Sequence, residues 1–571
     1  MKKIIYLFAF LSCFAVISCD ESLTEVPKDF SSPENSFTNK ANFESALANI
    51  YLTFRTQMYV GDGDSYTSFD MMGVDVDFGD NKLNNTTYNE TFKWNTFNPD
   101  NGFPAKWWAR FYDWIFQANT IIGRAEEPAA KWASDAEKNA IVGEAKFLRA
   151  FAYHFLGNMW GGVPLVLTET KGPKFDYVRA TQDEVYQQCK SDLEFAVQWM
   201  PTVNLLKGGR APREAAYHLL SEIKICLKDY QGAVDAASSV IGGANHNLMT
   251  ARFGAWKNFT FTGYSYRGPY IPWGDVYFDL FQDGNFNWKE GNRECIWNIQ
   301  QDLKILGGGN DVNTAGGLFG MERWWGPNYW SIKDTKGVIN FLKDTLQGRP
   351  VGTIIVSGYA DTIIWRYKGD WNNDIRNSQF NVQRTWYWTN PANQYYGQVI
   401  TPAAIATPTA STVLLSPQFK KVVTAVHYHQ FQDATSKQWH DNGRTYKDWY
   451  IMRLAETYLL RAEAYLLKGD KQKAADDINM IRNRAKATPV LAGEVTIDLI
   501  LDERARELYQ EEFRVNTLMR MGKLTEYLMK YNGAIKKNGY SIPDHLNKMP
   551  IPRSEIEANK DAVLEQNPGY N

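Results

Sequence analysis

Apolar and polar residues alternate with a helical period through most of the first 250 residues. Behind a capping box at Ser134–Glu137, where the serine and glutamate satisfy each other's backbone amides, apolar residues recur at three- and four-residue steps. They are Ile141, Ala145, Leu148, Ala152, Phe155 and Met159. A Gly-Gly-Val-Pro turn at 161–164 stops this helix. A second box, Thr181–Glu184, opens a helix that Pro201 ends. This region is predicted to be helical.

Two stretches repeat one arrangement of helices. Residues 213–241 and 453–485 each predict a helix, a short break and a second helix. An alanine, Ala233 or Ala474, follows each break, where a small side chain lets two antiparallel helices approach closely. The pattern is typical of tetratricopeptide-type helix pairs, here degenerate and not in tandem. We predict a mainly α fold, a tetratricopeptide-like helix-pair scaffold interrupted by a long insertion.

The insertion differs in composition from the rest of the chain. It is rich in Gly, Asn, Asp and aromatic residues, and short β-type runs occur at Thr353–Val356 and Thr412–Leu415. Eleven of the 20 Trp residues fall between Trp256 and Trp388. Long loop-rich segments inside a compact protein usually carry function. We divide the chain into 1–18, 19–250, 251–440 and 441–571, with 251–440 a ligand-binding excursion and the helical regions beside it packing as one body.

The first 18 residues have the form of a signal peptide. Lys2 and Lys3 precede an apolar run at 4–17, which is too short for a spanning helix. The run ends in Val-Ile-Ser-Cys19, which resembles a bacterial lipobox, so we expect Cys19 to be lipidated; the alternative is a plain secretory signal. Asp20 and Glu21 resemble the surface-export signal of Bacteroidota lipoproteins. We expect a lipid-anchored protein on the outer membrane that faces the exterior.

Charge and cysteine content exclude several classes of protein. With 62 Lys and Arg against 64 Asp and Glu, the net charge of -2 gives no footprint for nucleic acid. No CxxC pair is present, so a structural zinc site of that type is not expected. Cys189, Cys226 and Cys295 lie in apolar patterns and are predicted to be buried free thiols, although one disulfide among them remains open.

Several carboxylates are candidates for ligand binding, metal binding or catalysis. Asp75 and Asp77 lie in a Gly/Asp-rich stretch, which suits a solvated turn, sugar-hydroxyl binding, weak structural calcium binding or, least of all, catalysis. Glu503, Glu507 and Glu511 recur at four-residue steps among arginines, as in a scaffold ion-pair network. His427 and His429 lack a third ligand, so no metal site is predicted. No GxSxG, HExxH or GxxxxGK[ST] string is present.

The tryptophans indicate a function more clearly than the carboxylates do. A pyranose presents apolar C–H faces, against which a flat indole or phenol packs while polar side chains bond the hydroxyls. The densest cluster of aromatic residues, at 324–330, surrounds a Gly-Pro turn, which indicates that the cluster lies on a loop. The candidate ligand-binding aromatics are Trp94, Trp288, Trp324, Trp325, Tyr329 and Trp330. Trp107 and Trp108 open a helix and are assigned to the scaffold.

Several segments together resemble the SusD/RagB family of outer-membrane nutrient-binding lipoproteins. They cover almost the whole mature chain in the expected order. They are GEAKFLRAFAYHFLGNMWGGVPLV at 143–166, Trp108, Tyr112, Ile115 and Asn119 of a WxxxYxxIxxxN helix, Gly209–Ala211, Tyr450–Glu456, Ile481–Ala485, Leu501–Glu507, Pro550–Pro552 and Gln566–Tyr570. The 251–440 region matches poorly beyond Asp374–Arg376.

The resemblance implies a fold and a function. Members have tetratricopeptide-like helix pairs and capture an oligosaccharide at the cell surface for a SusC-type TonB-dependent transporter in the outer membrane. They are not enzymes, and no cofactor is expected. Two alternatives remain open at this point. One is a peptide- or glycoprotein-binding member of the same uptake system, and the other is a helical glycoside hydrolase.

Overall fold

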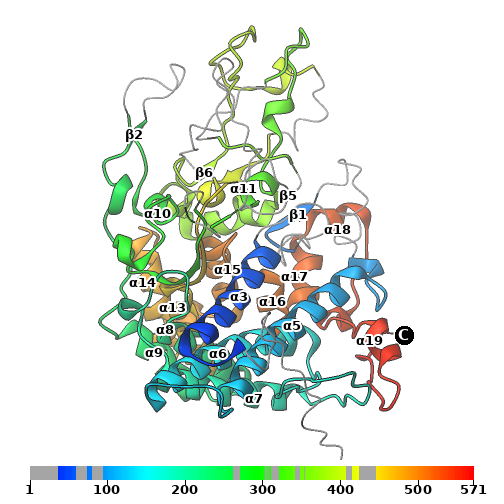
Figure 1. Cartoon of the computed structure of the whole chain (residues 1–571). Coiled ribbons are helices and arrows are strands. Elements are labelled where there is room, and N and C mark those ends of the chain that lie inside the picture. Colours follow the sequence, from blue (N-terminus) through cyan, green and yellow to red (C-terminus); the bar gives the residue numbers. More distant parts are fainter. Residues whose placement is uncertain are drawn as a thin grey trace, which may run out of the picture.

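A computed structural model shows a helical body with a loop-rich region above it (Figure 1). It describes residues 36–59, 74–79, 94–261, 271–302, 305, 308–309, 320–340, 347–352, 354–406, 415–423 and 445–570. Cys19, residues 1–18, His427 and His429 lie outside these ranges. No helix in the described ranges is long and apolar enough to cross a membrane.

The described part of the N-terminal half supplies six helices of the body. They are α3 (Lys40–Met58), α5 (Gly102–Arg124), α6 (Asp135–Trp160), α7 (Gln182–Trp199), α8 (Arg213–Cys226) and α9 (Tyr230–Ile241). One of the two predicted capping boxes is complete: Thr181 and Glu184 cap α7 reciprocally. At α6 the Ser134 hydroxyl accepts the backbone N–H of Glu137, but the Glu137 carboxylate accepts the N–H of Ala133 and not that of Ser134. Capping therefore sets where α6 and α7 begin, as the sequence predicted.

The C-terminal region completes the body. It contains α13 (Leu454–Lys468), α14 (Lys471–Arg484), α15 (Ile497–Leu508), α16 (Arg514–Arg520), α17 (Leu524–Tyr531), α18 (Gly533–Asn538) and α19 (Arg553–Ala558). The predicted pairs are α8 with α9 and α13 with α14, and α13 also packs on α9. Ala233 and Ala474 are fully buried. A small cluster of Ile225, Ala233, Val234, Leu460 and Ala464 joins the two pairs. The mainly α fold with helix pairs is confirmed.

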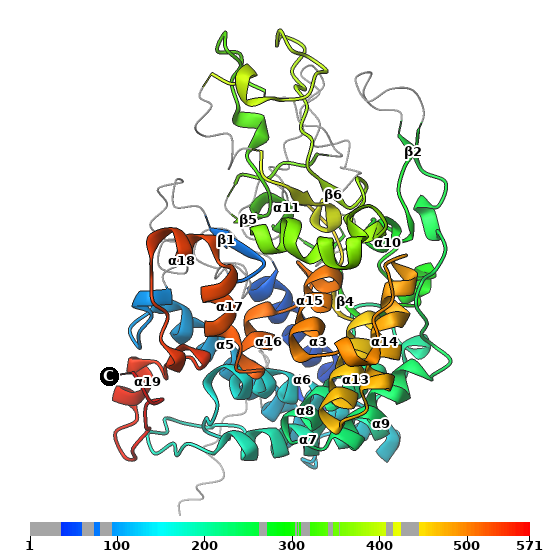
Figure 2. The ribbon, with the colours of Figure 1, turned by 180° about the vertical axis from the view of Figure 1, so that it is seen from behind.

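The insertion holds short elements instead of long helices. Its α-helices within the described residues are α10 (Val276–Leu280) and α11 (Met321–Trp324). The described strands form antiparallel pairs: β1 (Asp77–Gly79) with β5 (Ile354–Val356), β2 (Thr260–Phe261) with β3 (Ile271–Pro272), β4 (Cys295–Ile299) with β8 (Trp449–Arg453), and β6 (Val382–Gln383) with β7 (Gln418–Phe419). In Figures 1 and 2 this green-to-yellow region stands over the helices. Pairings β1–β5 and β4–β8 attach it to the body.

Buried ion pairs lie between the body and the insertion. The Arg453 guanidinium contacts Glu507 at 2.7 Å and Glu294 at 2.8 Å, and all three side chains are buried. Burial alone would raise the pKa of Glu507, yet the guanidinium groups of Arg484 and Arg453 hold that pKa at about 2. Glu503 and Glu511 join the same network through Arg376 and Lys421. The prediction of a scaffold ion-pair network is confirmed.

The three cysteines and one of the two β-type runs lie in the described part of the chain. Cys189 and Cys295 are buried, Cys226 is half-buried, and all three are free, so the prediction of free thiols is confirmed. Burial raises the pKa of Cys226 to about 12. The run at Thr353–Val356 contains β5. Most of the run at Thr412–Leu415 lies outside the described residues.

Candidate functional site

Most of the predicted aromatic platform lies in the core. Trp324 and Trp325 are 5% and 2% exposed, at the end of α11, and Tyr329 is fully buried. The amide after Trp325, that of Gly326, donates to the Ile354 carbonyl at 2.9 Å, so the segment joins β5. Tyr329 stacks on Trp386 with ring centroids 4.5 Å apart. The expectation that these three rings lie on an exposed loop is therefore wrong, because strand pairing draws them inward.

The acidic candidates are also buried. Asp75 forms an ion pair with Arg514, whose guanidinium donates to both carboxylate oxygens. Asp77 lies in β1 and accepts the Trp325 indole N–H at 3.3 Å. Burial raises the pKa of Asp77 to about 7. The expected solvated turn is thus wrong for both residues. They are core groups: Asp77 links the N-terminal region to the insertion, and Asp75 links it to α16 of the body. Trp94 is also buried, at 2% exposed, and packs against Phe97.

Two predicted tryptophans keep part of their surface exposed. Trp330 donates its indole N–H to the Pro350 carbonyl at 2.7 Å, and the Arg349 guanidinium lies 4.6 Å from its ring centroid. Trp288 donates to the Asn245 carbonyl at 2.7 Å, and Arg293 lies 3.7 Å from its ring centroid. Each ring is thus fixed by its N–H and accompanied by a cation. An indole beside a guanidinium offers an apolar face and hydrogen-bond donors together, which suits a polyhydroxylated ring.

The structure describes no metal centre at these positions. Within the described ranges, no group of three or more His, Cys, Asp or Glu side chains is placed to hold a metal ion. Asp75 is committed to Arg514, and Asp77 to Trp325. The calcium alternative therefore has no ligand set in this part of the chain, and it stays a prediction.

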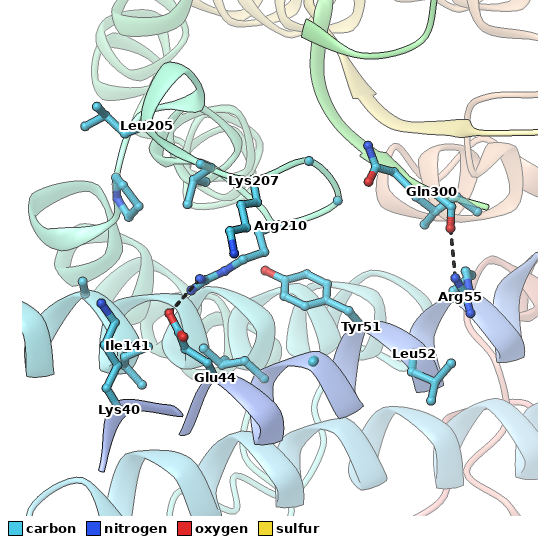
Figure 3. A pocket seen from close by; sticks show the side chains of 18 of the residues that line it. Lys40, Glu44, Tyr51, Leu52, Arg55, Ile141, Leu205, Lys207, Arg210 and Gln300 are labelled. Carbon is cyan, nitrogen blue, oxygen red and sulfur yellow. Dashed lines mark hydrogen bonds and ion pairs between the residues drawn. The ribbon is translucent and has the colours of Figure 1, made fainter. Parts of the chain in front are cut away.

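A wide cleft that the sequence did not reveal runs along α3. It encloses about 790 Å³ between α3, the start of α6, the 201–210 segment and the end of β4. Figure 3 shows its walls: Arg210 pairs with Glu44, and Arg55 donates to the Gln300 carbonyl at 2.9 Å. The only sequence signal for it was the Gly209-Arg210-Ala211 segment, which indicated a helix start and not a cavity wall.

Charged groups in the cleft are largely satisfied by one another. Arg210 also pairs with the buried Glu144. Burial alone would lower the pKa of Arg210, but the hydrogen bond and the negative charge of Glu144 outweigh it and raise the pKa. Lys40 lies 3.5 Å from Glu137. Tyr51 is the one aromatic lining residue, and its hydroxyl donates to Glu144 at 2.6 Å. A cleft of paired charges with a single, hydrogen-bonded phenol suits sugar stacking less well than the two Trp–Arg pairs do.

Comparison with known families identifies the chain's relatives. A model described as the SusD family matches residues 320–570, and one described as starch-binding associating with outer membrane matches residues 27–225. A SusD-like protein of Formosa agariphila is 23% identical over 97% of this chain and 96% of its own length. The starch-binding protein SusD of Bacteroides thetaiotaomicron is 42% identical over 21% of each chain.

Solved structures share the fold. Surface glycan-binding protein A of Bacteroides thetaiotaomicron, in complex with laminarihexaose, aligns with a TM-score of 0.65 at 20% identity, covering 93% of this chain and 100% of that one. A laminarin-binding SusD-like protein aligns with a TM-score of 0.63 at 20% identity, over 94% of this chain and 100% of its own. The family models match both halves of the helical body. The chain belongs to the SusD/RagB family.

Proposed function

We propose that this protein binds an oligosaccharide at the cell surface and delivers it, uncleaved, to a SusC-type TonB-dependent transporter. The observation that carries the proposal is family membership over both halves of the body. Two relatives with the same fold are described as binding laminarin or laminarihexaose. Lipidation of Cys19 and attachment to the outer membrane with the body facing outward are part of this proposal, and they rest on the lipobox-like sequence.

The Trp–Arg pairs are the proposed contact points for the sugar. Trp330 with Arg349 and Trp288 with Arg293 each combine a half-buried ring with a nearby guanidinium. A pyranose face packs on the indole while the guanidinium donates to ring hydroxyls. Aromatic contacts of this type add roughly 0.5–1.5 kcal/mol beyond area burial, so several are needed for useful affinity. Binding without cleavage is proposed because the predicted acidic pair, Asp75 and Asp77, is buried and engaged with Arg514 and Trp325.

Calorimetric titration against a panel of β-glucan, α-glucan and other oligosaccharides tests the proposal. The protein should bind at least one of them, and chromatography of the mixture after long incubation should show no shorter products. Trp330→Ala should weaken binding by about tenfold, equivalent to about 1.4 kcal/mol. Lys207→Ala, in the wall of the α3 cleft, is the matched control and should leave affinity unchanged. Loss of binding in the Lys207 variant alone would move the sugar to the cleft.

A peptide ligand is the second candidate. The same titration with unglycosylated peptides separates the two classes, because the Trp–Arg pairs are proposed to recognise sugar faces. Binding of peptides but of no oligosaccharide would replace the glycan proposal by peptide uptake. Appearance of shorter sugars in a contaminant-free preparation would instead favour the hydrolase alternative.

A further inference from the structure

An apolar pocket lies in the helical body, where residues from the first third of the chain meet the C-terminal segment. It encloses about 250 Å³ between α5, the segment after α6 and α19. Figures 1 and 2 show α5 and α19, the cyan helix and the red C-terminal one, on the same side of the body. Its lining is mostly aromatic and aliphatic: Trp108, Ala109, Tyr112, Ile115, Phe116, Pro164, Val166, Thr170, Tyr177, Glu555, Asn559 and Leu564.

Glu555 is the one charged side chain in that lining. Its carboxylate accepts the Trp108 indole N–H, and burial raises its pKa. Tyr112 and Asn559, two further polar residues of the lining, are engaged by the backbone. The Tyr112 hydroxyl donates to the Pro164 carbonyl at 2.7 Å, and the Asn559 amide bonds both the amide and the carbonyl of Tyr177 at 2.8 Å. The pocket therefore presents one carboxylate inside an aromatic and aliphatic wall.

No described cation neutralises this carboxylate by an ion pair. Arg179 is nearby but donates to the Gly162 and Glu565 carbonyls and to Asn567. Lys174, 5.4 Å from the Tyr177 ring centroid, is paired with Asp176 at 2.6 Å. A half-buried carboxylate without a counter-charge is costly, and a cation among aromatic rings is favoured. The pocket thus has the chemistry of a site for an organic cation with an apolar stem.

The surroundings of the pocket point to a macromolecular ligand. Phe116, at the pocket wall, is 43% exposed. Chain neighbours of lining residues are also exposed and apolar: Leu167, Phe175, Val178 and Val563. The Asp561 amide donates to the Phe175 carbonyl at 2.9 Å, which joins the segments before Tyr177 and after α19. Exposed apolar side chains close in sequence to a pocket lining are typical of an interface anchor, and they exceed what a small free amine needs.

We propose that this pocket receives a lysine or arginine side chain of a partner polypeptide, with the alkyl stem against Trp108 and Tyr112 and the charged end at Glu555. Phe116 and the exposed apolar side chains named above then pack on the surface of the partner around that lysine or arginine. The inference is independent of the glycan proposal, since it uses none of the Trp–Arg pairs of the insertion.

Saturation-transfer NMR with the full chain and Nα-acetyl-lysine methylamide tests it. The probe should bind, and Nα-acetyl-norleucine methylamide, which has the stem without the charge, should bind at least about fivefold more weakly. Glu555→Gln should abolish this preference. Glu557→Gln, an exposed change on the same helix, is the matched control and should keep it. Phe116→Ala should weaken the binding of both probes, which checks the pocket without touching the carboxylate.

Equal binding of the lysine and norleucine probes, or no binding of either, would overturn the proposal. So would a charge preference that survives Glu555→Gln. The alternative ligand of the pocket is a lipid ammonium group, and phosphatidylethanolamine vesicles test it. The Cys19→Ala protein, tested by flotation, should not bind them through this pocket. Flotation that is lost on the additional change Glu555→Gln would assign the pocket to lipid and overturn the partner proposal.

Discussion

The helical body and the insertion hold themselves together by different means. In the body, charged side chains are buried in pairs, with Arg520 on Glu463 at 2.7 Å and Arg482 on Glu503 at 2.8 Å. In the insertion, a separate small core is built mainly from rings and aliphatic side chains around Tyr329 and Trp386. Buried ion pairs allow only one arrangement of their side chains, because a buried charge without a partner is costly. Aromatic packing tolerates more variation in the side chains that form it.

This difference explains where binding surfaces arise. A body whose core charges are mostly held in ion pairs is rigid and leaves few charged groups in that core for recognition. The insertion carries half-buried rings beside guanidinium groups, at Trp330 and Trp288, which are placed by hydrogen bonds to backbone carbonyls. A rigid scaffold that supports variable loops is the usual division of labour in binding proteins.

The largest expected effect comes from breaking the ionic core. Glu507→Gln leaves Arg453 and Arg484 short of a counter-charge in the interior, so it should lower the free energy of unfolding by about 3–5 kcal/mol. Urea denaturation followed by far-UV circular dichroism measures this. Glu526→Gln, which breaks an exposed pair with Lys523, is the control and should cost less than about 1 kcal/mol. Similar losses in both variants would contradict the distinction between the two kinds of pair.

Truncation inside the small core of the insertion should act locally. Trp386→Ala removes the ring that stacks on Tyr329 and should cost about 3–5 kcal/mol of stability within this core. Hydrogen–deuterium exchange should then accelerate at residues 386–405, while α13 and α14 keep their protection, because the cluster is separate from the main core. Uniform loss of protection throughout the helices would show that the two regions unfold as one unit.

Asp77, where the regions meet, should give an effect that is smaller per pH unit. Its pKa is raised from 3.8 to about 7 by burial, so between these values the folded state keeps a proton that the unfolded chain has lost. Stability should therefore fall as pH rises through this window, by at most about 1.4 kcal/mol per pH unit from this group. Asp77→Asn should flatten that part of the profile in urea titrations between pH 4 and 8. An unchanged slope would mean that Asp77 is ionised in the folded protein.

The sequence predicted the body well because its signals are local. The N-caps at Ser134 and Thr181 and the buried alanines Ala233 and Ala474 are signals contained within one or two helical turns, and each was confirmed in place. The glutamate ladder at 503–511 is visible in its spacing alone, although its partners Arg482 and Arg453 lie in other elements. Helical periodicity shows which face is buried without any knowledge of the partner.

The site was predicted less well because burial in the insertion is decided by distant residues. Trp324 and Trp325 stand beside Gly and Pro and have the composition of a loop. Yet the Trp325 indole meets Asp77, 248 residues earlier. Asp75 likewise meets Arg514, 439 residues later. No local pattern encodes such pairings, and the α3 cleft, built from four separate segments, left no signal either.

Hydrogen–deuterium exchange with a saturating oligosaccharide ligand tests the central claim most directly, because it needs no substitution. The account predicts slower exchange at 328–331, 347–352 and 287–293, around Trp330 and Trp288, with the helices unchanged. Slower exchange confined to α3 and residues 201–210 would place the sugar in the α3 cleft and contradict the assignment of recognition to the insertion.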